Sequence, residues 1–95
     1  KGTGLWTVIS ALELGASVPT IYASLNARVM SSMKTQRIQA EKIFKKIETK
    51  HLDFGNTSDG MKPLMDAVVL ATIASYAQGM ELMRIASNEY KYNFH

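Results

Sequence analysis

The first residues of the chain combine groups that suit anion binding. Residues 1–7 read KGTGLWT, in which Lys1 and Thr3 alternate with Gly2 and Gly4 ahead of a tryptophan. An ammonium group beside the unhindered backbone N–H groups of a glycine turn could hold a phosphate or a carboxylate at the start of a helix. The segment is not a P-loop, because the lysine of a P-loop follows its last glycine, and it lacks the third glycine and preceding strand of a dinucleotide-binding turn. On these residues alone, a turn that simply begins a helix is the preferred interpretation.

A second candidate for anion binding, Arg28, lies on a helix that we expect to begin near Pro19. Ile21, Leu25 and Val29 follow at helical spacing and mark its apolar face. Arg28 lies at the edge of that face, where its aliphatic stem can cover apolar surface while the guanidinium stays in water. The alternative is a guanidinium aimed at a phosphate or a carboxylate. Spacing alone favours the first alternative.

Helix-end signals predict the elements that position these candidates. Apolar residues at helical spacing predict a first helix over residues 5–14, and Gly15 suits the position just after its end. A second helix is expected to begin with Pro19 in its first turn and with Ser17 or a neighbour as its cap. Both candidate segments therefore belong to helices.

The rest of the chain also has a helical pattern. A thin apolar stripe predicts a third helix over residues 34–48, and residues 51–60 are rich in turn formers. A last helix is expected over residues 61–88, with Pro63 in its first turn. The predicted fold class is all-α, with about four helices.

The last predicted helix has an uncharged middle section. No charged residue lies between Asp66 and Glu81. A surface helix shows a polar side, so this helix is predicted to be buried on nearly every side. The uncharged section is too short, and its residues are too polar, to cross a bilayer as an apolar segment. Three short helices provide too little cover, so we expect the remaining cover to come from further chain, a partner subunit, or both.

Composition excludes several classes of site. The chain has no cysteine, which rules out disulfides, thiolate metal sites and a cysteine nucleophile. His51 and His95 lack metal-ligand spacing, so no metal site is expected. The net charge is +3, and basic residues gather in residues 34–50 without a nucleic-acid motif. A solvated helix face is the preferred interpretation, and neither nucleic acid nor a membrane is expected as a partner.

Two separated motifs carry a resemblance to a known family. Residues 1–32, KGTGLWTVISALELGASVPTIYASLNARVMSS, resemble part of the all-helical domain of the 6-phosphogluconate dehydrogenases. Residues 75–87, SYAQGMELMRIAS, resemble a later helix of the same domain. The order of the motifs also agrees with the family. One departure is Leu5, which stands where many members have a second lysine.

The resemblance implies a cytoplasmic, homodimeric enzyme that converts 6-phosphogluconate to ribulose 5-phosphate and CO2, with NADP as hydride acceptor. In that family the lysine and threonine of KGTG and the arginine of the AR pair bind the substrate phosphate, and the matching residues are Lys1, Thr3 and Arg28. The family's general base and acid precede KGTG, and NADP is bound mainly outside the matching segment. We therefore expect residues 1–95 to be part of the all-helical substrate-binding and dimerisation domain, without catalytic residues and inactive in isolation.

A second hypothesis remains open. The chain could be a non-catalytic helical oligomerisation module related to the hydroxyacid dehydrogenases, in which KGTG is only a structural turn. The two hypotheses differ in what precedes the chain, because the first requires a strand, a GxGxxG turn and a helix upstream.

Overall fold

The chain is helical throughout the part that the structure describes. The computed structural model describes residues 2–44 and 57–94, without the side chains of residues 57–59. Its elements are α1 (Thr3–Glu13), α2 (Pro19–Ser32), α3 (Lys34–Ile43) and α4 (Thr57–Tyr90). These residues contain no strand, and the predicted all-α class with four helices is confirmed.

Helix α1 begins earlier than predicted and ends as predicted. The Gly2 carbonyl accepts hydrogen bonds from the N–H groups of Leu5 and Trp6, which makes Thr3 the first helical residue. At the other end Gly15 has a φ of 67°, in the left-handed region that favours glycine. The N–H of Ala16 then donates to the Ala11 carbonyl at 2.7 Å. This turn directs the chain from α1 toward α2.

Helix α2 begins at Pro19 as predicted, but Ser17 does not cap it. Val18 occupies the N-cap position, and its side chain makes no capping hydrogen bond. A single residue, Met33, separates α2 from α3, and α3 ends at Ile43 rather than at residue 48. Residues 45–48 of the predicted third helix lie outside the described residues.

Helix α4 is longer than predicted at both ends. It runs through 34 residues, and Pro63 lies inside it rather than in its first turn. The predicted loop over residues 51–60 is wrong at residues 57–60, which are helical, and residues 51–56 lie outside the described residues. His51 and His95 also lie outside the described residues.

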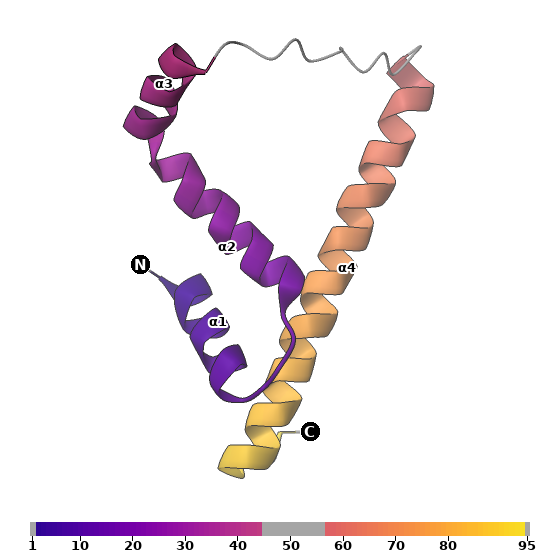
Figure 1. The fold of residues 1–95 in the computed structure, drawn as a ribbon. Helices are drawn as coiled ribbons and strands as arrows, with labels where there is room; N and C mark the ends of the chain where they lie inside the picture. The colour runs from indigo at the N-terminus through magenta and orange to yellow at the C-terminus, as the bar shows by residue number, and fades with distance from the viewer. Residues whose placement is uncertain (1, 45–56, 95) are drawn as a thin grey trace.

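The core lies where the link between α1 and α2 passes along α4. Figure 1 shows α2 and α4 diverging from this point in a V, with α1 beside α2. Helix α2 packs against both α1 and α4. The buried apolar side chains there are those of Ala11, Ala16, Val18 and Leu82, with Leu14, Ile21 and Ile85 packed around them.

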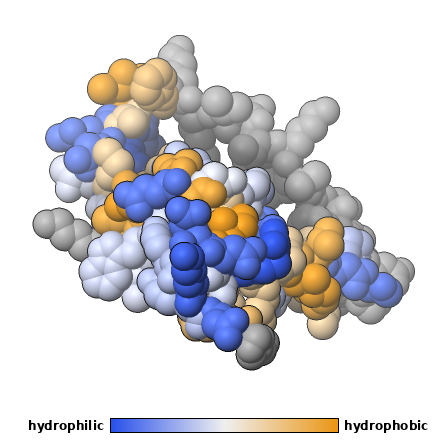
Figure 2. Space-filling model, turned by 90° about the horizontal axis from the view of Figure 1, so that it is seen from below, coloured by the Kyte–Doolittle hydropathy of each residue, from blue (hydrophilic) through white to orange (hydrophobic). Residues whose placement is uncertain are grey.

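The prediction of a buried final helix is wrong for this chain alone. Helix α4 is about 50 Å long at 1.5 Å per residue, and only its C-terminal half reaches the core. Val69, Ile73 and Tyr76 are 56%, 60% and 68% exposed. Seen from below, apolar residues lie at the surface beside polar ones (Figure 2). The described helices are too few to cover α4, and none of them is both long and apolar enough to span a membrane.

Candidate functional site

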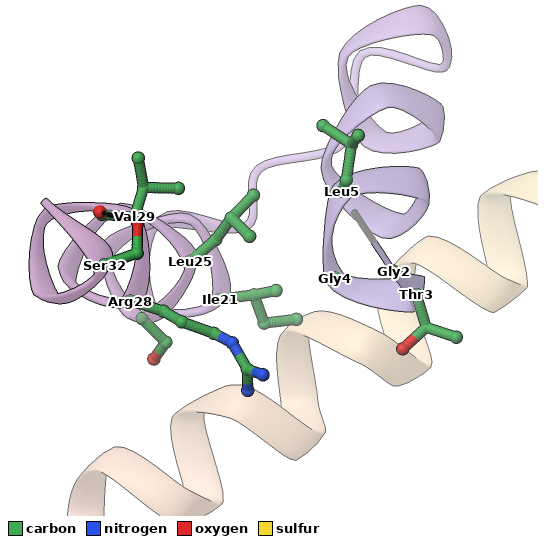
Figure 3. Close-up of a pocket in the computed structure, with 10 residues that line it drawn as sticks. Gly2, Thr3, Gly4, Leu5, Ile21, Leu25, Arg28, Val29 and Ser32 are labelled. Atoms are coloured by element: carbon green, nitrogen blue, oxygen red, sulfur yellow. Dashed lines mark hydrogen bonds between the residues drawn. The ribbon is translucent and has the colours of Figure 1, made fainter.

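A groove between α1 and α2 brings two of the predicted site residues together. It has a volume of about 750 Å³ and is lined by residues of both helices (Figure 3). Thr3 lies at the start of α1, and Arg28 lies near the C-terminal end of α2. Figure 3 shows the Thr3 hydroxyl and the Arg28 guanidinium both facing the space between the helices. The lining residues, here called the α1–α2 groove, are Gly2, Thr3, Gly4, Leu5, Ile21, Ser24, Leu25, Arg28, Val29 and Ser32.

The third predicted site residue, Lys1, lies outside the described residues. Its role therefore stays a prediction. Its neighbour Gly2 lines the groove.

The start of α1 gives the groove a positive partial charge. The N–H groups of Thr3 and Gly4 have no acceptor within α1, because the first N–H groups of any helix lack a preceding turn. The first turn contains no acidic residue, and Gly2 as N-cap makes no side-chain capping bond. The positive end of the helix dipole therefore faces this end of the groove without a competing carboxylate.

Arg28 adds a full charge to the same groove. The ion pairs within residues 2–44 and 57–94 join Lys62 to Asp66 and Arg84 to Glu81, both on α4. Arg28 takes part in neither pair, and its side chain is exposed. Its guanidinium can present two parallel donors to a phosphate or a carboxylate.

The hydroxyl groups of the groove differ in what they bond. Ser24 Oγ donates to the Thr20 carbonyl at 3.0 Å, and Ser32 Oγ donates to the Val29 carbonyl at 2.6 Å. The hydroxyl protons of both serines are therefore already donated to carbonyl groups of α2. Within the described part of the chain no such bond engages the Thr3 hydroxyl, which leaves its proton for an anion.

Sequence reasoning missed both serines as lining residues. Ser24, Arg28 and Ser32 recur every four residues and so share one face of α2. That spacing was a usable signal for the groove. The closeness of the two helices had no comparable signal. Gly4 faces Leu25, but a Cβ added at Gly4 would lie 3.6 Å from Leu25 Cδ1, an ordinary contact distance, so the packing does not require a glycine there.

Sequence reasoning also missed the contact that begins α2. Gln78 on α4 places Oε1 3.0 Å from the Thr20 N–H nitrogen and 3.4 Å from that of Ile21. Its Nε2 donates to Thr20 Oγ1 at 2.9 Å. The side chain that satisfies the first turn of α2 therefore comes from another helix, and local sequence gives no signal for such a partner.

The described lining residues of the groove suit an anion and include no group for proton transfer at neutral pH. Arg28 is the one ionisable residue among its lining residues in the described structure. The Arg84 guanidinium lowers the pKa of Glu81 through a hydrogen bond and charge attraction, but this pair lies on the exposed surface of α4. The arrangement therefore favours recognition of a phosphate or carboxylate over acid–base chemistry.

Comparison with known proteins gives consistent matches. The profile of the 6-phosphogluconate dehydrogenase C-terminal domain matches residues 1–95. Over 94 residues, 98% of this chain, the sequence is 45% identical to "6-phosphogluconate dehydrogenase, decarboxylating" of Synechocystis sp., covering 19% of that protein. Identity is 42% to "6-phosphogluconate dehydrogenase, decarboxylating 1, chloroplastic" of Arabidopsis thaliana, across 98% of this chain and 20% of that protein.

A more distant bacterial relative gives the same picture. The "6-phosphogluconate dehydrogenase, decarboxylating" of Shigella boydii is 40% identical over 98% of this chain and 20% of its own length. The chain thus spans about one fifth of the length of these curated relatives. No solved structure matches it.

Proposed function

This chain belongs to the 6-phosphogluconate dehydrogenase family, within its C-terminal domain, and from that premise we propose that it supplies the phosphate-binding part of a substrate site. The complete enzyme would oxidatively decarboxylate 6-phosphogluconate to ribulose 5-phosphate, with NADP as hydride acceptor. The observation that carries the proposal is the α1–α2 groove, in which Arg28 faces the start of α1.

Each proposed contact contributes a different type of interaction with the phosphate. Arg28 would donate two hydrogen bonds to phosphate oxygens, Thr3 would donate one from its hydroxyl, and Lys1 would add a point charge. The N–H groups at the start of α1 would face the same anion. Binding energy gained at this non-reacting phosphate would orient the substrate carbons that undergo oxidation and decarboxylation.

The described residues do not fit NADP. They contain no strand, and therefore no strand–turn–helix unit of the kind that holds a dinucleotide. Hydride transfer and proton transfer are accordingly assigned to parts of the enzyme outside this chain, and the isolated chain is expected to be inactive.

We also propose that α4 contributes to the core of a homodimer. Its middle section is uncharged and carries large apolar side chains that the described helices leave exposed. Such a surface is more extensive than the scattered apolar residues of an ordinary monomer surface. The proposed location is the cytoplasm, although the Arabidopsis relative is named as chloroplastic.

The test is NADP reduction by the full-length protein that carries this chain, with 6-phosphogluconate as substrate. We expect turnover by the wild type and a KM raised by about ten- to a hundredfold in Arg28→Met, because a charged hydrogen bond contributes about 1.5–3 kcal/mol. Lys1→Met should also raise KM. Lys42→Met is the control, since Lys42 lies on α3 outside the groove and its loss should leave KM unchanged.

The outcomes separate the two hypotheses. Turnover with a KM that neither Arg28→Met nor Lys1→Met changes would keep the family activity and reject the phosphate site. A correctly folded dimer without turnover would instead favour the non-catalytic oligomerisation module.

A further inference from the structure

We propose that Gln78 is a positioning residue for the phosphate site: by fastening the first turn of α2 to α4, it sets where Arg28 lies in the α1–α2 groove. This inference rests on the proposed function, because it assigns to Gln78 an effect on phosphate binding through Arg28. Gln78 is not itself among the residues that line the groove.

The backbone N–H groups in the first turn of α2 find no acceptor among the neighbouring residues of the sequence. Val18, the N-cap residue, makes no side-chain capping bond, and Pro19 has no N–H group. The next two N–H groups, of Thr20 and Ile21, both donate to Gln78 Oε1. Gln78 therefore does for α2 what a serine or aspartate at the N-cap does for most helices.

The amide of Gln78 is held in one orientation. Its Nε2 donates to Thr20 Oγ1, so the two ends of the amide bond different groups of the same turn. Both partners are partly buried. Reversal of the amide would lose both N–H bonds, because an NH2 group cannot accept from an N–H group.

These bonds restrain α2 in a way that its apolar contacts do not. Contacts such as that of Ile21 with the core are non-directional and permit small rotations and tilts. Hydrogen bonds to Oε1 weaken steeply as their angles depart from linearity. Gln78 therefore fixes both the axial position and the rotation of α2 at its N-terminal end.

The effect of this restraint grows with distance along α2. Arg28 lies seven residues beyond Ile21, which is about 10 Å along the helix axis. A tilt of about 10° at the first turn would displace Arg28 by about 2 Å at that rise per residue. A displacement of that size is enough to break a bidentate contact with a phosphate, because misplacement by about 1 Å can already cost orders of magnitude in rate.

The experiment measures KM and kcat of the full-length enzyme for Gln78→Met and Gln78→Glu, each with and without Arg28→Met. Methionine is similar in length but cannot accept the two N–H bonds, whereas an ionised glutamate can, with the Thr20 hydroxyl donating to it. We expect Gln78→Met to raise KM for 6-phosphogluconate about tenfold and to change kcat less. Gln78→Glu should keep a KM near that of the wild type at neutral pH, because a carboxyl oxygen can accept both N–H bonds. Gln36→Met, on the exposed face of α3, is the matched control.

The double variant distinguishes positioning from general damage. If Gln78 acts through Arg28, the KM of Gln78→Met with Arg28→Met should equal that of Arg28→Met alone, and Gln78→Met should not change KM for gluconate, which has no phosphate. Additive effects, an equal loss with gluconate, or a Gln78→Glu enzyme that behaves like Gln78→Met at neutral pH would overturn the inference. Absence of wild-type turnover would instead reject the proposed function on which it depends.

Discussion

A charged side chain in the middle of α4 should dissociate the proposed homodimer. Ile73 is the residue of choice, because it lies in the uncharged section of α4 and is 60% exposed in this chain. Burial of a whole isoleucine side chain contributes about 1.5–3 kcal/mol, so covering its exposed part contributes about 1–2 kcal/mol per subunit. A two-fold dimer contains the substitution twice. Loss of this burial alone therefore weakens association by about 2–4 kcal/mol, which is about 30- to 1000-fold in the dissociation constant.

The assay is sedimentation velocity of the full-length protein over a range of concentrations. Ile73→Asp should show at least this weakening, because the dimer would also have to bury a carboxylate. Leu12→Asp is the matched control, since Leu12 is 75% exposed on α1 and lies away from α4's uncharged section. An Ile73→Asp protein that stays dimeric at wild-type concentrations would refute the assignment of the dimer core to α4. Equal weakening by Leu12→Asp would move the interface elsewhere.

Two further predictions concern stability and pH. Gly15→Ala should lower the free energy of unfolding, measured in urea, by about 1–2 kcal/mol because φ at this position is positive. Gly79→Ala lies inside α4 with nothing near its Cβ position and should raise the free energy of unfolding by up to about 1 kcal/mol. Equal effects of the two substitutions would contradict the left-handed turn at Gly15. The Glu81 carboxyl should titrate below its ordinary pKa because Arg84 bonds it, so its small contribution to stability is present above the ordinary pKa and is lost as pH falls through the lowered one. An NMR titration of Glu81 in Arg84→Met should show the pKa rising toward the ordinary value, and an unchanged pKa would mean that the pair does not form in solution.

Local signals predicted the helix boundaries that depend on backbone geometry. Gly15 ends α1 and Pro19 begins α2 because one residue tolerates positive φ and the other needs no N–H partner. The same type of reasoning was wrong for Ser17 and Pro63. Ser17 does not cap because the N-cap position falls on Val18, and Gln78 supplies the acceptor instead. Pro63 lies inside α4 because the helix begins several residues earlier. A helix can continue through a proline when the remaining turns are otherwise favourable, so proline alone does not fix a helix start.

The candidate site was only partly accessible from the sequence. The chemistry of Thr3 and Arg28 identifies them as possible anion ligands, but their common groove depends on how α1 packs on α2. The helical spacing of apolar residues does not predict that packing. The cover of α4 could not be located for a related reason: an uncharged helix is expected to be covered, but the pattern does not reveal whether its cover lies in the same chain.

The bond between Thr20 and Gln78 also has a consequence for the order of folding. The two residues are 58 positions apart, so the first turn of α2 cannot be completed until the second half of α4 has been synthesised. At ordinary rates of translation this interval is about 3–12 s, far longer than the time in which a helix forms. During that interval α1 and α2 can become helical but lack the partner that fixes their arrangement. The nascent groove is thus a late product of biosynthesis, and slow or interrupted translation between these residues would prolong the exposure of its apolar walls.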